Sequence, residues 1–211
     1  MIRLLDIYSK VVLNKKQMKT IGIILIFALF ISCSRKHITL EKASKYPVKF
    51  SSQKITSPNI DFEIYIPKNW EWKIEDYGVE NIITAIDAAS KPSQEGFIDI
   101  ISIQKIQSFG NNKDLKSEYE YYIGLIENQS RSLEIIEKGQ TNILKEKAYF
   151  IHTKSNTGTY GEIETITFIV ESKDKGVFFN ISAGASQTKD LMKHMAIIIQ
   201  SVKTFNINLE K

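Results

Sequence analysis

The sequence predicts an α+β domain, an antiparallel β-sheet covered by two helices, that follows an export leader. Three patterns predict the domain. Apolar and polar residues alternate in several segments, short turn sequences join most of these segments, and two longer segments repeat apolar residues at helical spacing. Strands joined by short turns pair antiparallel, and each helix has to bury its apolar stripe on the sheet. The predicted order is β-β-β-α-β-β-β-β-α.

The first predicted strand begins at Asp61. Phe62, Ile64 and Ile66 share one face of it, and Pro67 ends it. The further strands are predicted over residues 81–88, 97–106, 135–143, 148–153, 163–171 and 177–183. The turn sequence at residues 173–176, between the last two strands, is typical of a hairpin.

The two predicted helices cover residues 113–129 and 189–205. Each repeats apolar residues at i, i+4, i+7, i+8 and i+11, which is the pattern of a helix with one buried face. The two stripes are Leu115, Tyr119, Tyr122, Ile123 and Ile126, and Leu191, Met195, Ile198, Ile199 and Val202.

The N-terminal region is typical of an exported protein. Lys15, Lys16 and Lys19 precede the uncharged residues 20–31, whose length fits the apolar core of a signal peptide. As a helix this core would cover about 18 Å, well short of the roughly 30 Å of a membrane's hydrocarbon. The segment therefore favours a leader over a permanent membrane span.

The start of the leader has two interpretations, Met1 and Met18. Met18 gives the more compact leader, so we interpret residues 18–32 as the signal peptide and residues 1–17 as a misassigned upstream extension.

Residues 30–33, Phe-Ile-Ser-Cys, resemble a bacterial lipobox, in which a small residue precedes the modified cysteine. The resemblance implies cleavage before Cys33, a diacylglycerol on its sulfur and a palmitate-type acyl chain on its amino group, which together give stable anchoring. Phe30 departs from the usual leucine, and an uncleaved anchor or a plain signal peptide is the alternative. With no aspartate at position 34 and no acidic cluster after it, we expect the periplasmic face of the outer membrane.

The charge of the chain argues against nucleic-acid binding. Residues 1–32 hold five of the 28 Lys and Arg and one of the 24 Asp and Glu, which leaves 23 of each sign from residue 33 onward. A nucleic-acid-binding domain carries a basic surface, and this neutral remainder does not. Cys33 is the only cysteine, so disulfides and cysteine metal sites are excluded.

Residues 33–56 contain few apolar side chains, and we interpret them as a lipid-anchored tether in which a strand near residues 46–50 is an alternative. Residues 57–208 form the predicted single domain. Its opening Ile64-Tyr65-Ile66-Pro67, followed by Trp70, resembles the start of the Mog1/PsbP-like fold, as does the C-terminal helix that ends near Phe205. The resemblance implies an α/β/α sandwich with a binding or assembly role, because members of this group share a fold and not a reaction.

The sequence has no motif of an enzyme or a metal site. His37, His152 and His194 lack the spacing of metal ligands, and His194 follows Asp190 at a distance that suits a surface ion pair. Glu162 and Glu164 share a strand face, which we expect to be solvated. A cavity that joins these two carboxylates to His152 would instead indicate an enzyme. We expect no cofactor, no metal and no catalytic residue.

Two aromatic residues are candidates for lining a ligand groove between sheet and helix, Trp72 and Tyr121. The leading hypothesis is a non-enzymatic periplasmic lipoprotein that binds or scaffolds an envelope protein. A small-ligand-binding lipoprotein is the alternative.

Overall fold

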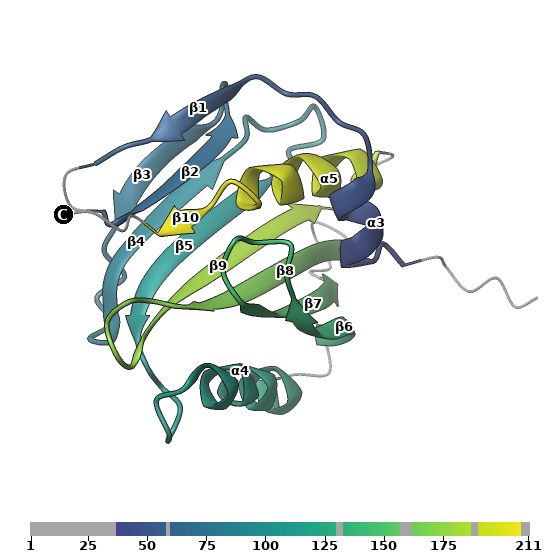
Figure 1. The fold of residues 1–211 in the computed structure, drawn as a ribbon. Coiled ribbons are helices and arrows are strands. Elements are labelled where there is room, and N and C mark those ends of the chain that lie inside the picture. The colour runs from purple at the N-terminus through teal and green to yellow at the C-terminus, as the bar shows by residue number, and fades with distance from the viewer. Residues whose placement is uncertain (1–36, 58–59, 130–132, 157–161, 187–189, 208–211) are drawn as a thin grey trace, which may run out of the picture. The chain divides into compact units, whose positions relative to one another are not determined.

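The computed structural model describes residues 37–57, 60–129, 133–156, 162–186 and 190–207 (Figure 1). The chain divides into two units, residues 1–37 and 38–211, and apart from His37 the described residues all belong to the second. The leader and Cys33 lie outside the described residues. Among the residues described, no helix is both long and apolar enough to cross a membrane.

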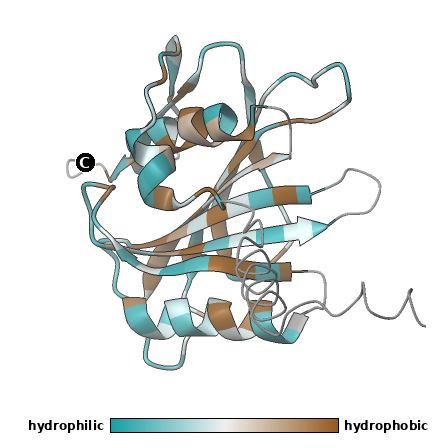
Figure 2. Cartoon of the chain, turned by 90° about the vertical axis from the view of Figure 1, so that its right-hand side faces the viewer, coloured by the Kyte–Doolittle hydropathy of each residue, from teal (hydrophilic) through white to brown (hydrophobic). Residues whose placement is uncertain are grey.

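A seven-stranded sheet forms the centre of the unit, and every neighbouring pair of its strands is antiparallel, as predicted. In spatial order its strands are β3 (Glu71–Glu75), β4 (Ile82–Ala89), β5 (Ile100–Gln107), β9 (Val177–Ser186), β8 (Glu162–Glu171), β7 (Ala148–Asn156) and β6 (Leu133–Thr141). Hydrophobic and hydrophilic segments alternate along these strands in Figure 2, because successive side chains point to opposite faces of a sheet.

Helices cover both faces of this sheet (Figure 1). One face packs against α4 (Leu115–Gln129). The other packs against α5 (Leu191–Val202), which also contacts α3 (Leu40–Lys45) and a small antiparallel sheet. The small sheet has the order β1 (Ser52–Ile55), β2 (Phe62–Pro67), β10 (Asn206–Ile207). The predicted α/β/α sandwich is therefore confirmed, and the described residues include one helix, α3, that was not predicted.

Each helical layer encloses its own apolar core. The larger core lies between the seven-stranded sheet and the layer of α3, α5 and β2, and the rings of Phe62, Phe179 and Phe205 meet in it with centroids 5.3–5.6 Å apart. The smaller core lies under α4 and contains Ile106, Leu115, Ile169 and Phe178. Burial on both faces explains why the central strands β8 and β9 are apolar along much of their length.

The segment predicted as a tether is part of the folded unit from Ile38 onward. Ile38, Leu40, Ala43 and Ile55 are buried in the larger core. The N–H of Leu40 donates to the Glu137 carboxylate at 2.9 Å, and β1 forms at residues 52–55 instead of 46–50. The tether prediction for residues 38–56 is wrong because a few apolar residues are enough to anchor the segment when Ile38, the helix α3 and the strand β1 each bury some of them in the larger core.

Candidate functional site

The two predicted groove residues lie on opposite faces of the large sheet. Trp72 is half-buried on β3 and packs against the larger core, on the side of α5. Tyr121 is on α4, where its ring stacks on Phe109 with centroids 5.4 Å apart and planes 8° apart. Trp72 and Tyr121 therefore do not line a common groove. Cys33, the predicted lipidation site, lies outside the described residues.

The β3–β4 hairpin exposes more large apolar side chains than other parts of the described chain. Eight such side chains are exposed among the described residues, and four of them lie within residues 74–83. They are Ile74, Tyr77, Val79 and Ile83, each 44–48% exposed. We call these four residues the hairpin surface. Exposed apolar surface is typical of contact sites for other molecules, and a hairpin that exposes four large apolar side chains is a candidate for such a site.

Local hydrogen bonds hold the hairpin surface in place. The Asp76 carboxylate accepts from the Gly78 N–H at 2.9 Å, and Gly78 has φ +63°, a conformation that glycine adopts without strain. The Tyr77 hydroxyl donates to the Asp87 carboxylate. Burial, followed by this hydrogen bond, raises the pKa of Tyr77 above its ordinary value. Sequence reasoning missed this surface, although the turn formers and the apolar residues around them were visible.

The hairpin is acidic, although the charges of residues 33–211 as a whole sum to zero. Residues 71–87 contain five carboxylates and one lysine, Lys73, which pairs with Glu75. From residue 33 to the C-terminus the two signs are equal. The hairpin surface is therefore an apolar area flanked by negative charge.

The hairpin also forms an edge of the large sheet. β3 is the first strand of the spatial order, and within the described sheet its one paired neighbour is β4. An edge strand presents backbone N–H and C=O groups to which another chain can bind.

A buried polar pair lies on the opposite half of the sheet. His152 is fully buried, Glu164 is 6% exposed, and the His152 Nε2 lies 3.1 Å from the Glu164 carboxylate. The prediction of a solvated face is wrong for Glu164, because it shares a face of β8 with the buried Ile166 and Phe168. Glu162 beside it pairs with Lys154 at 2.8 Å.

His152 pairs with Glu164 and Lys154 pairs with Glu162, and none of the three cavities described below is lined by these residues. Within the described residues, no three histidine, aspartate or glutamate side chains are grouped so that they could hold a metal ion. The pair on β7 and β8 therefore has the features of a structural contact.

His194 pairs with a different residue from the one predicted. Its Nδ1 lies 2.5 Å from the carboxylate of Asp99, which precedes β5. Asp190, the predicted partner, occupies the N-cap position of α5. His37 is exposed.

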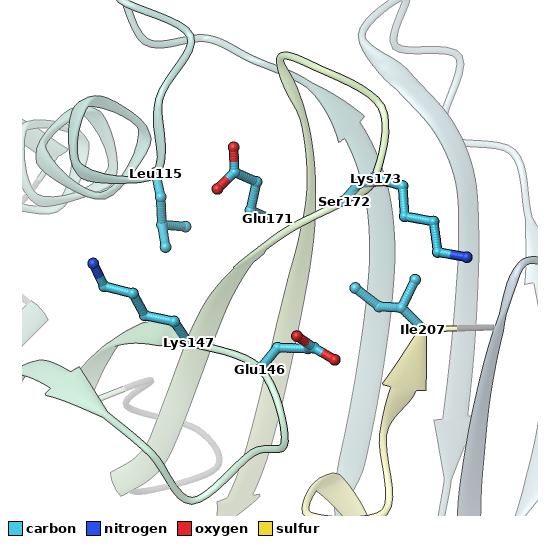
Figure 3. A pocket seen from close by; sticks show the side chains of 7 residues that line it. All are labelled: Leu115, Glu146, Lys147, Glu171, Ser172, Lys173 and Ile207. Atoms are coloured by element: carbon cyan, nitrogen blue, oxygen red, sulfur yellow. The ribbon is translucent and has the colours of Figure 1, made fainter. Parts of the chain in front are cut away.

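A cavity of about 320 Å³ opens where the β6–β7 loop meets the β8–β9 turn (Figure 3). We call it the end cavity. Leu115, Ser172 and Ile207, all buried, form its floor. Its rim is charged and consists of Glu146, Lys147, Glu171 and Lys173. Two other cavities, of about 420 Å³ beside α3 and about 90 Å³ beside β1, are lined by other residues.

No protein-family model matches the sequence, and no curated protein does. Among solved structures, the chain is similar to cyanobacterial PsbP (CyanoP) from Synechocystis sp. PCC 6803, with a TM-score of 0.54 at 11% identity over 83% of this chain and 97% of that one. The Ran-binding protein Mog1p of Saccharomyces cerevisiae gives 0.49 at 10% identity over 75% and 96%. LpqN of Mycobacterium tuberculosis, involved in cell envelope biogenesis, gives 0.45 at 12% identity over 71% and 88%.

The domain therefore has a Mog1/PsbP-like fold, as the order of its elements predicted. At identities this low, the likeness concerns the fold alone, and function has to be argued from the sites of this chain.

Proposed function

We propose that this protein is a non-enzymatic, lipid-anchored module of the bacterial cell envelope that binds another envelope protein through the hairpin surface. The observation that carries the proposal is the concentration of exposed apolar side chains on an acidic hairpin at a sheet edge. Protein contact sites commonly combine an apolar centre with a polar rim.

The location rests on the leader and the cysteine that follows it. Residues 18–32 supply a signal peptide, and Cys33 supplies an attachment point for acyl chains that would hold the domain at the periplasmic face of the outer membrane. The folded unit begins at Ile38, so the anchor and the domain are only a few residues apart along the chain.

The partner's chemistry follows from the hairpin. An apolar area with flanking carboxylates is complementary to a protein surface that is apolar at its centre and basic at its rim. Complementary charge speeds the encounter and excludes acidic partners, while burial of the apolar side chains holds the complex together.

Site-specific photo-crosslinking in cells tests the partner site. A photoreactive residue at Ile83 should give a reproducible adduct of defined mass, whereas the same residue at Ile98, which is 43% exposed in the loop before β5, should not. Equal adducts from both positions, or none from Ile83, would contradict the role of the hairpin surface.

The anchor is tested separately. Cells grown with radiolabelled palmitate should label the parent protein and not Cys33→Ser, and the variant should leave the membrane fraction. Label on Cys33→Ser would show that the lipid is not attached at this cysteine.

Truncating the hairpin side chains should weaken the complex by an amount that can be worked out. Full burial of a large aliphatic side chain contributes about 1.5–3 kcal/mol. Since Ile74 and Ile83 are each 48% exposed, roughly half of that amount, about 1 kcal/mol each, remains to be gained in a complex. The double change Ile74→Ser and Ile83→Ser should therefore reduce affinity by roughly 30-fold.

A further inference from the structure

The end cavity is unlike the hairpin surface, because it is a hollow with charges of both signs around an apolar floor. Lys147 comes from the β6–β7 loop and Glu171 from the end of β8, so the fold brings together opposite charges that are distant in sequence. Leu115 at the start of α4 and Ile207 on β10 contribute the apolar floor from the two helical layers.

Among the rim charges, those of Glu146, Lys147 and Glu171 are not paired with one another in the described part of the chain. No ion pair joins Lys147 to Glu171 or Glu146 within the part of the chain that the structure describes. In Figure 3 the side chains of Lys147 and Glu171 extend toward the same side of the cavity, near Leu115, and Glu146 extends toward Ile207. Each of these charges therefore has room for a ligand group.

We propose that the end cavity binds a small zwitterion with an apolar side chain, such as an aliphatic α-amino acid or the end of a short peptide. The ligand's carboxylate would pair with Lys147, its ammonium group with Glu171, and its side chain would rest on Leu115 and Ile207. A ligand with both charges fits a rim with both charges, whereas a ligand with one charge leaves an opposite charge on the rim unpaired.

The size of the cavity sets the class of ligand and its affinity. About 320 Å³ is at the lower end of the range for ligand cavities, which favours a single amino acid or a dipeptide. The rim is solvated and solvated ion pairs are weak, so we expect a dissociation constant of about 1 mM.

Titration of the folded chain with leucine, followed by NMR, tests the proposal. Resonances of residues 146, 147 and 171–173 should shift and saturate. Isoamylamine has leucine's apolar group with the positive charge alone, and 4-methylpentanoic acid has it with the negative charge alone. Each should bind about fivefold more weakly, since each lacks one solvated ion pair.

Variants identify the groups responsible. Lys147→Met and Glu171→Gln should each raise the dissociation constant for leucine by about fivefold or more, because each removes one pairing group. The matched controls Lys91→Met and Glu134→Gln change exposed charges away from the cavity and should leave it unchanged. The double change Lys147→Glu with Glu171→Lys keeps both charges and should retain binding.

Three results would overturn the proposal: no saturable shift with leucine, equal binding of the singly charged probes, or equal effects of the cavity and control variants. Because the hairpin surface shares no residue with the end cavity, these results leave the proposed partner site untouched.

Discussion

Replacing His152 with leucine should destabilise the domain strongly. His152 is fully buried and its Nε2 lies 3.1 Å from the carboxylate of Glu164, which is 6% exposed. Leucine fills a similar volume but donates no hydrogen bond, so Glu164 would remain buried without its histidine partner. Removing one member of such a buried pair costs about 3–5 kcal/mol, against a total stability of about 5–15 kcal/mol for a domain.

The second half of the prediction concerns the removal of both polar groups. The variant His152→Leu with Glu164→Leu leaves no charge to bury, and it also removes the His152 Nδ1, which is buried without a hydrogen-bond partner among the described residues. Replacing a buried pair by apolar residues of similar volume is often neutral or stabilising. The double variant should therefore regain most of the stability that the single variant loses.

Urea denaturation followed by tryptophan fluorescence measures both effects, and the slope of the transition shows whether unfolding stays two-state. In thermal melts followed by the same fluorescence, the single variant should lower the midpoint by about 6–20 °C, given about 2–4 °C per kcal/mol for a domain of this size. As a control, Lys116→Met removes the exposed Lys116–Glu120 pair and should not move the midpoint measurably. A single variant as stable as the parent, or a double variant no better than the single one, would refute the reasoning.

Three further predictions follow from other buried groups. Burial raises the pKa of the Tyr122 hydroxyl to about 12, so the unfolded chain loses this proton at a lower pH than the folded chain. The free energy of unfolding should therefore fall by roughly 2–3 kcal/mol as pH rises from about 10 to 12. Urea midpoints measured across this pH range should fall less for Tyr122→Phe than for the parent protein, and an equal fall would contradict the prediction. Leu40→Ala should cost about 2–5 kcal/mol in the same assay, because Leu40 is 3% exposed, whereas a residue in a solvated tether would cost nothing. Glu118→Ala should lower the free energy of unfolding by about 3 kcal/mol or more, since the Glu118 carboxylate accepts hydrogen bonds from Ser108, Phe109 and Gly110. In this variant the amide hydrogens of residues 108–110 should exchange faster, because the carboxylate that holds the loop is gone.

The periodic elements were predictable because periodicity reports burial directly. The stripe from Leu191 to Val202 predicted a helix with one buried face. In α5, four of the five stripe residues are buried and the fifth, Leu191, packs against the larger core. The hairpin that joins β8 and β9 followed from the turn sequence at residues 173–176.

Short elements were missed because they carry too few residues to show a period. α3 has six residues and β1 has four, and neither buries enough side chains to stand out from a tether. What holds α3 in place is not local: Leu40 contacts Glu137, and the carbonyl of Ser44 accepts from Gln200, across 97 and 156 residues of sequence. No pattern within residues 38–45 encodes those partners.

The position of Glu164 could have been read from the sequence. Side chains two apart in a strand share a face, so the buried face that contains Ile166, Phe168 and Val170 extends back to Glu164. The alternation of Glu162 and Glu164 with Ile163 and Thr165 favoured a solvated face for the two glutamates. Steps of two residues back from Val170, through Phe168 and Ile166, place Glu164 on the buried face, as observed.

The same counting on β3 constrains how a partner can approach the hairpin. Glu71, Lys73 and Glu75 share one face of this strand, while Trp72 and Ile74 share the other, opposite the buried Ala88 and Ile86 of β4. Alternating charge on an edge strand discourages indiscriminate pairing with other strands. The apolar face of this edge strand is therefore the one that carries Trp72 and Ile74, on the side of α5. A partner that pairs with β3 has to match the two carboxylates and Lys73 while it buries Ile74, which is a more selective requirement than apolar contact alone.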